Sequence, residues 1–501
     1  MVLQVLSGAR WYSLHLHVAS SPRTTRLYSP YGSSMMTDQR EEFNVTALAR
    51  TAHFARFCLA FLLGSALPVT PGFAQTHGAF VQTVSPGQSI QAAIDRAPLG
   101  GWIFVQPGTY QETADATNGL NITESVNLVG LSTATQKVVL KNAGGQKNGI
   151  VAVPAAHTKC MSCHSSMAPP FDLLPGVRRT VSTQPIIFGL SISGITIQDF
   201  DNNGLFTSNV KDFTIIDVHS VGNKDYGIFP TLSQNGVITD SSATGANDTG
   251  IWIETSQDVT ATRNLVEGNV LGFEVSNSDR IQLTDNEVRG NSVGMGIFFL
   301  PDIFDERPDT TRITVRNNYI HDNNKADTSP LASLVPSSVG VLLLGADNSQ
   351  ISDNLIAGHD FVGIGVADYC LVAQGGPLDC TVDPHVSPGF LADNTASQNR
   401  VTGNELTNNG AHPDPTNPFA FAAGDIALLT SGPNGNCFAG NQFSTFFSSL
   451  GFLPPCPASS SFFLRGWYSP HLHVASSRGT TRLYSPYGFS TDMRGADKGI
   501  R

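Results

Sequence analysis

A glycine followed by bulky residues recurs at nearly constant spacing through the middle of the chain. The repeated points are Gly204-Leu-Phe, Gly227-Ile-Phe, Gly250-Ile-Trp, Gly272-Phe-Glu, Gly296-Ile-Phe, Gly340-Val-Leu and Gly363-Ile-Gly. Their separations are 23, 23, 22, 24, 44 and 23 residues. A period in the low twenties indicates a solenoid, in which each repeat forms one turn and contacts its neighbours. The interval of 44 residues predicts two turns, with 322–338 as an outward loop.

The intervals between these glycines contain a second repeated segment, in which apolar residues flank a turn residue. The segments are 261-ATRNLV-266, 283-LTDNEV-288, 315-VRNNYI-320, 351-ISDNLI-356 and 401-VTGNEL-406. Such short strands can pair with the turns above and below them, about 4.8 Å away. Asparagine suits the tight corners because it tolerates left-handed backbone geometry, and stacked asparagines can form hydrogen bonds along the solenoid. The pattern lacks the leucine spacing of leucine-rich repeats, and its period is too long for a β-sandwich. It predicts an all-β parallel β-helix.

The segment 84–112 reads VSPGQSIQAAIDRAPLGGWIFVQPGTYQE and begins with an amphipathic pattern. Apolar residues of 89–97 fall on one helical face, and two glycines end the expected helix. WIFVQPGTY predicts a strand, and 125–132 predicts the next one. This opening resembles the N-terminal cap and first coil of the right-handed parallel β-helix proteins of the pectate-lyase-like superfamily. The resemblance covers about residues 84–450 and implies a right-handed, single-stranded parallel β-helix of about 23 residues per turn, with a short N-terminal capping helix. The fold leaves function open, because its members include lyases, hydrolases, epimerases, maturation factors and surface proteins.

The two ends of the chain carry nearly the same sequence. Residues 11–34 and 467–490 match at 20 of 24 positions. A structural repeat normally lies inside a fold and diverges further. We therefore interpret 1–34 and 458–501 as spurious or disordered extensions. A pair of recognition arms rich in histidine, tyrosine and arginine is the alternative.

Residues 35–74 are typical of a signal peptide. An apolar run, FCLAFLLGSALPV, follows two arginines and precedes the small-x-small sequence Gly72-Phe-Ala74. The run is short for a membrane span, and a buried helix is the alternative interpretation. We expect export to the periplasm or the extracellular space, and a β-helix domain over 75–457.

Charge and cysteine content fit an exported protein. The formal net charge of -11 and the absence of a basic stretch argue against a nucleic-acid partner, and no later stretch predicts a membrane span. Six cysteines follow the signal peptide, at positions 160, 163, 370, 380, 437 and 456. An even number in an oxidising compartment favours disulfides. Cys370 with Cys380 and Cys437 with Cys456 are candidate pairs, although spacing alone does not fix connectivity.

A proline-rich insertion over 154–185 interrupts the solenoid and contains 157-HTKCMSCHSS-166. Cys160, Cys163 and His164 have the spacing of a covalent c-type haem site, in which the cysteines form thioethers and His164 binds the haem iron. The following APPFDLLPGV resembles the segment after this motif in small cytochromes c. Alternatively, His157, Cys160, Cys163 and His164 could hold zinc or copper, or the two cysteines could form a local disulfide. Haem would indicate electron transfer with a periplasmic redox partner.

A second candidate site comes from the residues before the repeated glycines. Lyases of this fold commonly hold calcium with outward carboxylates and use an arginine or lysine as the base. Asn202, Asp225 and Asp248 each lie two residues before such a glycine, and Lys224 precedes Asp225. The resemblance implies that Asp225, Asp248 and Lys224 could bind calcium and remove a proton beside a uronate carboxylate. An acidic polysaccharide would then be the substrate. The alternative is that aspartate and asparagine simply favour these turns.

Other polar residues are weaker candidates for a functional site. The segment 383-DPHV-386 is similar to the Asp-Pro-His-Asp motif of alginate C5-epimerases, with Val386 in place of the second acid. His219, His359 and Asp360 are interpreted as hydrogen-bonding loop residues. The sequence therefore leaves three hypotheses: a haem-bearing redox or binding protein, a polysaccharide-active enzyme, and a non-catalytic metal-associated or surface-binding protein.

Overall fold

The computed structural model describes residues 2–7, 10–15, 80–155, 186–300, 310–326, 336–372, 395–457, 482–484 and 490–492. The chain divides into two compact units, Met1–Thr76 and His77–Arg501. In the first unit, β1 (Val2–Ser7) pairs antiparallel with β2 (Arg10–His15). In the second unit, β36 (Arg482–Tyr484) pairs antiparallel with β37 (Ser490–Asp492). The signal peptide expected over 35–74 lies outside the described residues, as do most positions of the two matching ends.

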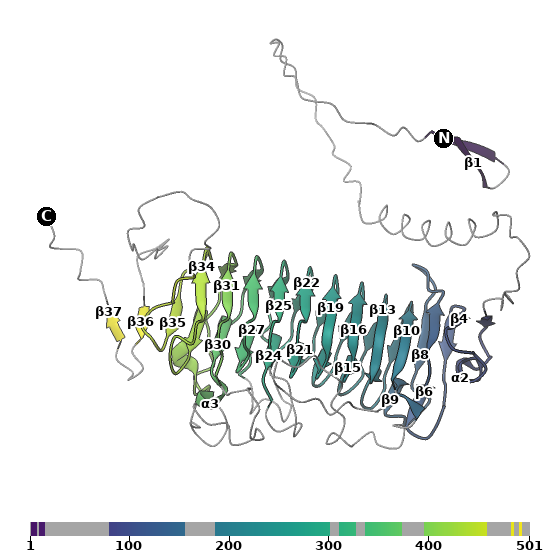
Figure 1. Cartoon of the computed structure of the whole chain (residues 1–501), viewed down its shortest axis with the longest axis horizontal. Coiled ribbons are helices and arrows are strands. Elements are labelled where there is room, and N and C mark those ends of the chain that lie inside the picture. Colours follow the sequence, from purple (N-terminus) through teal and green to yellow (C-terminus); the bar gives the residue numbers. More distant parts are fainter. Residues whose placement is uncertain are drawn as a thin grey trace, which may run out of the picture. The chain divides into compact units, whose positions relative to one another are not determined.

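The second unit is built from three parallel β-sheets of 12, 10 and 11 strands (Figure 1). Sheet 1 contains β3 (Val81–Val84), β4 (Gly101–Val105), β7 (Val126–Gly130), β10 (Ile187–Ser193), β13 (Val210–Ile216), β16 (Gln234–Thr239), β19 (Gln257–Thr262), β22 (Gln282–Thr284), β25 (Thr314–Arg316), β28 (Gln350–Ser352), β31 (Arg400–Thr402) and β34 (Cys437–Ala439). Sheet 2 contains β5 (Gly108–Tyr110), β8 (Val138–Lys141), β11 (Ile195–Gln198), β14 (His219–Val221), β17 (Ser242–Thr244), β20 (Leu265–Glu267), β23 (Glu287–Arg289), β26 (Tyr319–His321), β29 (Leu355–Ala357) and β32 (Glu405–Thr407). Sheet 3 contains β6 (Asn118–Ile122), β9 (Asn148–Ala152), β12 (Leu205–Ser208), β15 (Ile228–Thr231), β18 (Thr249–Glu254), β21 (Leu271–Ser276), β24 (Val293–Phe298), β27 (Val339–Leu344), β30 (Val362–Ala367), β33 (Gly424–Leu429) and β35 (Phe446–Ser448).

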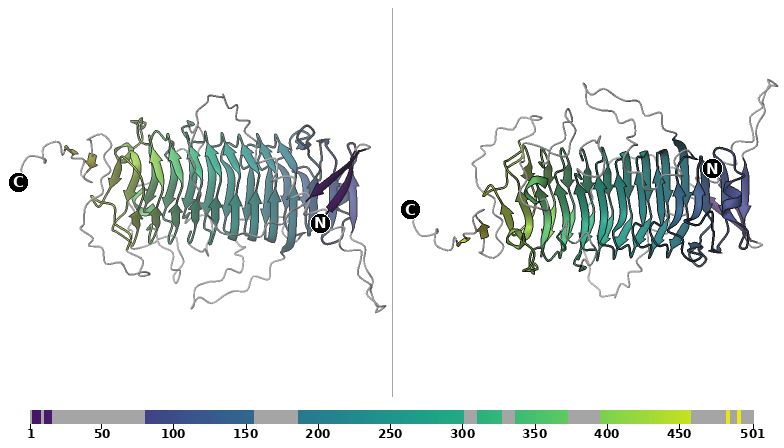
Figure 2. Two further views of the ribbon diagram at one scale, coloured as in Figure 1. Left: turned by 90° about the horizontal axis from the view of Figure 1, so that it is seen from above. Right: turned by 90° about the horizontal axis from the view of Figure 1, so that it is seen from below.

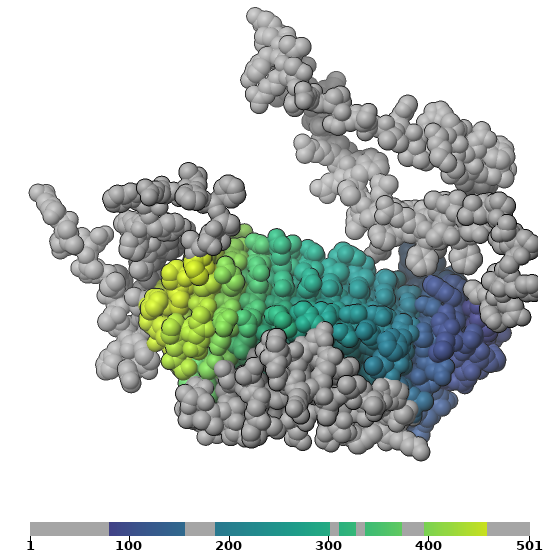
Figure 3. Space-filling view, in the orientation of Figure 1, coloured from purple at the N-terminus to yellow at the C-terminus, as the bar shows by residue number. Residues whose placement is uncertain are grey.

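The chain visits sheets 1, 2 and 3 in order and then advances by one strand in each. Strands of successive turns therefore lie side by side when the molecule is seen from above and below (Figure 2). The turns follow chain order from blue to yellow in the space-filling view (Figure 3). This arrangement is the parallel β-helix that the sequence predicts.

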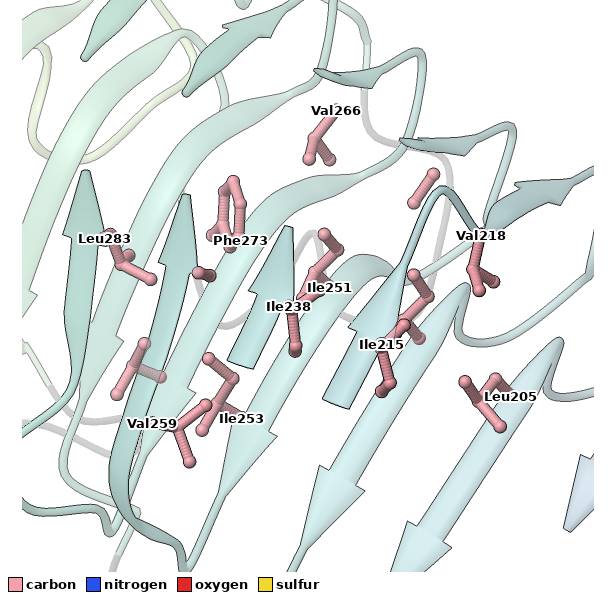
Figure 4. Packing of buried hydrophobic residues seen from close by; sticks show 14 of the residues in the cluster. Leu205, Ile215, Val218, Ile238, Ile251, Ile253, Val259, Val266, Phe273 and Leu283 are labelled. Carbon is pink, nitrogen blue, oxygen red and sulfur yellow. The ribbon is translucent and has the colours of Figure 1, made fainter. Parts of the chain in front are cut away.

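One hydrophobic core runs between the three sheets (Figure 4). Ile215, Ile238, Ala261 and Leu283 are paired neighbours on successive strands of sheet 1, and all four are fully buried. Alternate residues of a strand face opposite sides of its sheet, so every second side chain enters the core. Burial of each large apolar side chain contributes about 1.5–3 kcal/mol relative to exposure.

The repeated glycines form a ladder at the start of the strands of sheet 3, with one change from the expected alignment. Gly272 lies next to Gly294, and Gly294 lies next to Gly340, so Gly296 is not the equivalent residue. A Cβ on Gly227 or Gly272 would lie within 2.5 Å of the carbonyl oxygen of the next glycine in the ladder. Close backbone approach, rather than backbone conformation, therefore requires glycine here.

The long interval before Gly340 is one turn, not two as the sequence suggested. β24 pairs directly with β27, and β25 and β26 lie between them in the chain. The extra length falls in two insertions, 301–309 and 327–335, both outside the described residues. The insertions over 156–185, 301–309 and 373–394 all interrupt the passage from sheet 3 to sheet 1.

Asparagines form a hydrogen-bonded ladder at the corner between sheets 1 and 2. Each side-chain amide donates to the side-chain oxygen of the next member at 2.9–3.0 Å. The members are Asn264, Asn286, Asn318, Asn354, Asn404 and Asn441. The left-handed backbone conformation belongs to the preceding residue, for example Asp285 with φ 56°. The predicted ladder is confirmed, but the asparagines themselves do not occupy the left-handed positions.

A short helix, α2 (Ile90–Ile94), covers the first end of the core, as predicted. Ser89 is its N-cap and accepts a hydrogen bond from the backbone N–H of Ala92. The Glu112 carboxylate accepts hydrogen bonds from Ser89 Oγ at 2.9 Å and from the Ile90 N–H at 2.6 Å. The first N–H groups of a helix have no partner within the helix. In α2, Glu112, which follows β5, supplies a hydrogen-bond acceptor for them.

A disulfide joins Cys437 and Cys456, with an S–S distance of 2.11 Å. This pairing is the one expected from the sequence. Cys370, in α3 (Tyr369–Val372), is also disulfide-bonded. Cys380 lies outside the described residues, so its pairing with Cys370 stays a prediction.

Candidate functional site

The outer face of sheet 3 carries a row of large side chains in its N-terminal half. Phe206, Phe229, Trp252 and Glu274 occupy equivalent positions on β12, β15, β18 and β21. Their strand neighbours, such as Ile251 and Phe273, are fully buried in the core. Because side chains alternate along a strand, the row faces away from the core.

The aromatic members of this row form a cluster with Tyr226. The Phe229 and Trp252 rings are stacked, with centroids 4.2 Å apart and planes 6° apart. The Tyr226 centroid lies 4.7 Å from that of Trp252, and the Phe206 centroid lies 5.2 Å from that of Phe229. The indole N–H of Trp252 donates to Ser276 Oγ at 2.8 Å, which fixes the ring orientation. The result is a rigid aromatic wall with one polar edge.

Two carboxyl groups share a hydroxyl beside this wall. Thr249 Oγ1 lies 2.9 Å from Asp248 Oδ1 and 3.0 Å from Glu274 Oε2. A threonine hydroxyl has one proton and cannot donate to both carboxyl groups at once. A proton on Glu274 resolves this, because Glu274 can then donate to Thr249 while Thr249 donates to Asp248. The Tyr226 hydroxyl also forms a hydrogen bond with Asp248.

The surroundings favour the protonated form of Glu274. Its side chain is buried, and this burial raises the pKa of its carboxyl well above the usual value. The negative charges of Asp248 and Glu254 raise the pKa further, and the hydrogen bond between Thr249 and Glu274 acts in the opposite direction. Burial and the neighbouring acids likewise raise the pKa of Tyr226, so its phenol stays protonated. The site thus pairs Glu274, whose surroundings favour the neutral carboxylic acid, with the neighbouring Asp248, which accepts hydrogen bonds from both hydroxyls.

Glu254 completes the acidic side of the site. It is buried at the end of β18 and accepts a hydrogen bond from Thr231 Oγ1 at 2.8 Å. Its charge acts on Glu274, as described above. Burial of several acids around two aromatic rings is energetically unfavourable for folding alone, and such arrangements occur at functional sites.

The structure brings two of the three sequence-predicted catalytic residues to this face. Asp225 and Asp248 lie at equivalent positions of successive turns, two residues before Gly227 and Gly250. Burial raises the pKa of Asp225, although Lys147 and Lys224 act in the opposite direction. Asp248 forms hydrogen bonds with Thr249 and Tyr226. The charge of Asp225 acts on Tyr226.

Lys224 is poorly suited to act as a base. Its Nζ forms an ion pair with Asp201 Oδ1 at 2.5 Å, and the side chain is exposed. This hydrogen bond and charge raise the pKa of Lys224. A base must be deprotonated before it accepts a proton, so the ion pair works against the predicted role.

The calcium site expected from the sequence would lie at Asp225 and Asp248. Within the described ranges, no group of three or more histidine, cysteine, aspartate or glutamate side chains is placed to hold a metal ion. Calcium prefers six to eight oxygen ligands. Calcium binding near Asp225 and Asp248 therefore stays a prediction, and no catalytic step is assigned to calcium.

Other sequence-predicted residues lie away from this face or outside the described ranges. His219 contacts Ser242 Oγ at 2.8 Å and Asp217 Oδ1 at 3.1 Å, in agreement with a hydrogen-bonding role. His359 is a buried ladder residue between Asn323 and Asn409. Three further predictions fall outside the described residues: the haem ligands Cys160, Cys163 and His164, the alternative metal ligand His157, and the 383–386 motif.

Sequence reasoning missed Tyr226, Trp252 and Glu274 as site residues. For Trp252 and Glu274 the signal was present in the strand alternation, since both face outward on glycine-led strands, whereas Tyr226 lies just before β15 and outside any strand. Because Gly250 and Gly272 are aligned in successive turns, Glu274 falls directly after Trp252 in one outward row.

No helix in the described part of the chain is both long and apolar enough to cross a bilayer. The sequence matches the family described as "Right handed beta helix region" over residues 180–300 and 304–443, which together make up just over half of the chain. No match was found among curated proteins.

Several solved structures are similar to this chain at low sequence identity. The A-module of mannuronan C-5 epimerase AlgE4 from Azotobacter vinelandii is 18% identical, with a TM-score of 0.46 over 70% of this chain and 91% of that chain. The family 28 exopolygalacturonase of Yersinia enterocolitica is 11% identical, with a TM-score of 0.46 over 74% of this chain and 72% of that chain. Pectate lyase Pel9A is 13% identical, with a TM-score of 0.33 over 76% of this chain and 78% of that chain.

Proposed function

The chain belongs to the right-handed β-helix family, and we propose that it is an exported enzyme that acts on a polysaccharide at the outer face of sheet 3. The observation that carries this proposal is the adjacency of Trp252 and Glu274, paired neighbours on β18 and β21. Aromatic faces bind the apolar faces of ring-shaped ligands, and their polar edges fix orientation. A protonated carboxyl directly beside such a face can act on the bond next to the bound ring.

The two carboxyl groups have different assigned roles. Glu274 is the proton donor, because burial and the nearby acids raise the pKa of its carboxyl well above the usual value and so favour its protonated form. Asp248 is the proton acceptor or nucleophile, since it accepts hydrogen bonds from Thr249 and Tyr226. Pairs of carboxyl groups whose environments drive their pKa values apart are the usual basis of acid–base cleavage in carbohydrates.

Tyr226 and Thr249 are positioning residues in this mechanism. Both hydroxyls hold Asp248, and Thr249 links it to Glu274. After Glu274 gives its proton to the departing sugar oxygen, the Thr249 hydroxyl can turn to stabilise the new Glu274 carboxylate. The stacked Phe229 and Trp252 rings exclude water from one side of the reacting bond.

The test is activity of the full chain on alginate, polygalacturonate and neutral glucans and xylans. Reducing ends report hydrolysis, and ultraviolet absorbance of unsaturated uronides reports a lyase. We expect Glu274→Gln and Asp248→Asn to reduce turnover by about 10²–10⁴-fold, the range for loss of general acid–base catalysis.

Glu405→Gln is the matched control, because Glu405 is exposed on the outer side of β32 in sheet 2. It should leave turnover unchanged. Product release from none of the polymers, or equal activity in Glu274→Gln and Glu405→Gln, would overturn the proposal. The haem hypothesis is independent of this site and stays a prediction for the 154–185 insertion.

A further inference from the structure

Beyond β21, the outer face of sheet 3 is lined by apolar residues. The outward row that contains Trp252 and Glu274 continues through Gly296, Leu342, Gly365 and Ala427 on β24, β27, β30 and β33. The next outward row contains Phe298, Leu344, Ala367 and Leu429. These apolar residues belong to a hydrophobic cluster separate from the core between the sheets.

An apolar pocket lies on this part of the face. Its floor includes Leu342, Leu344 and Gly365, and its other side is formed by Val372 of α3 and by Phe419 and Ala422. Ala422 ends the short 3-10 helix η4 (Ala420–Ala422), and α3 is labelled at the lower edge of the green C-terminal turns in Figure 1. No charged side chain is among the described residues that line the pocket. An apolar ligand therefore fits it and a charged one does not.

Gly365 contributes backbone but no side chain to the pocket floor. It is not among the glycines with positive φ, so its backbone conformation does not require glycine. A Cβ at this position would lie 2.9 Å from Leu342 Cδ1. The Leu342 side chain therefore packs over Gly365, whereas Glu274 and Trp252 fill the same row three and four turns earlier.

On the basis of the function proposed above, we infer that the pocket binds the acyl chain of an acylated glycan. Glu274 and Leu342 lie in one row, two strands apart, which places them about 10 Å from each other at the usual strand spacing. A sugar against Trp252 would thus carry its substituent toward the pocket along a continuous face. An unmodified polysaccharide has no group that could replace water in this pocket, whereas an alkyl chain gains free energy with each buried methylene.

The test is calorimetric titration of the full chain with n-alkyl maltosides from hexyl to dodecyl, below their micellar concentrations. We expect affinity to rise by about fourfold per methylene, which corresponds to ~0.8 kcal/mol per buried CH₂. Gly365→Leu and Ala427→Leu, on neighbouring strands, should each abolish the chain-length dependence. Thr407→Leu is the matched control, since Thr407 is exposed on the outer face of β32.

The outcomes separate this inference from the proposed function. Chain-length dependence that Glu274→Gln retains and Gly365→Leu removes supports the pocket, whatever the turnover assays give. Affinity that is the same for hexyl and dodecyl maltoside overturns the inference, and this includes the case in which the chain's own residues fill the pocket. Equal affinities in wild type, Gly365→Leu and Ala427→Leu overturn it as well. Circular dichroism and thermal unfolding of both variants establish that they fold.

Discussion

Nδ2 of Asn323 lies 3.0 Å from Nε2 of His359, where a histidine takes the place of an asparagine in a second side-chain ladder. The ladder runs through Asn269, Asn291, Asn323, His359, Asn409 and Asp425. Asn323 donates to Nε2, so Nε2 is an acceptor, and Nδ1 donates to Asn409 Oδ1 at 2.8 Å. This arrangement needs the neutral imidazole with its proton on Nδ1.

His359 should make the β-helix sensitive to acid. Burial lowers the pKa of His359 from 6.5 to about 4. Between these values, the unfolded chain binds a proton that the folded chain excludes, so stability falls as the pH decreases. The loss from this residue is about 3 kcal/mol across the window. We expect His359→Asn, which keeps the ladder, to show a smaller decrease in urea midpoint between about pH 7 and pH 4.5. Equal decreases in both proteins would contradict this account.

In the ladder from Asn264 to Asn441, the central asparagines should contribute more to the free energy of unfolding than the terminal one. Asn286 accepts hydrogen bonds from the backbone and side chain of Asn264 and donates to Asn318 and to the Ala261 carbonyl. Asn286→Ala leaves buried partners without hydrogen bonds and should lower the free energy of unfolding by roughly 3 kcal/mol. Asn441→Ala, at the half-buried end of the ladder, should lower it by about 1 kcal/mol. Urea denaturation checks both values, and a larger loss in Asn441→Ala would refute this ranking.

Much of this fold follows from the sequence, because the glycine period, the short strands and the capping helix all reflect local backbone requirements. Gly227 and Gly250 recur because adjacent turns approach closely at these points. The placement of insertions could not be predicted equally well. Gly296 lies two residues from the true ladder position, Gly294, and either residue satisfies the pattern. Only strand pairing between β24 and β27 distinguishes one turn with two insertions from two turns.

The candidate site was partly predictable for a similar reason. Asp225 and Asp248 were identified by their fixed distance from the glycines, a feature of one turn. Glu274 becomes a candidate only through its neighbours, since the pKa of its carboxyl is raised by burial and by Asp248 and Glu254. The sequence did not reveal the ion pair of Lys224, because its partner, Asp201, lies 23 residues earlier, on the preceding turn. The sequence alone does not show which charged residues form ion pairs between adjacent turns.

Trp252 should report ligand binding directly. The ring stacks on Phe229 and donates a hydrogen bond to Ser276. Trp252→Ala should weaken binding of oligosaccharides by about 3- to 10-fold, the range for loss of one aromatic contact. Trp252→Phe keeps the stacking surface and should bind nearly as well as wild type. Fluorescence titration should show a saturable change in wild type and none in Trp252→Phe. An unchanged affinity in Trp252→Ala would exclude this wall from the binding site.

Glu274→Gln should be inactive and more stable than wild type at neutral pH. Because its folded pKa is raised, Glu274 must take up a proton on folding above its unfolded pKa. Its contribution to stability therefore decreases as the pH rises from the unfolded value through the folded value. Glutamine has the same shape and needs no proton, so the variant avoids this loss. Thermal unfolding at neutral pH should give a higher Tm for Glu274→Gln, with the difference shrinking toward acidic pH. A lower Tm at neutral pH would show that Glu274 is folded as a carboxylate.

The haem prediction rests on sequence alone and has a decisive spectroscopic test. Cys160 and Cys163 are spaced for two thioether bonds, and His164 follows directly as the axial ligand. We expect the exported protein, made together with cytochrome maturation machinery, to show a Soret band and sharp reduced α and β bands that survive denaturation. Cys160→Ala/Cys163→Ala should be colourless under the same conditions. A colourless wild type would exclude the haem and leave zinc, copper or a local disulfide for the insertion, which metal analysis and thiol titration distinguish. The activity expected at Glu274 should be the same in either case, because the proposed mechanism takes no electron from the insertion.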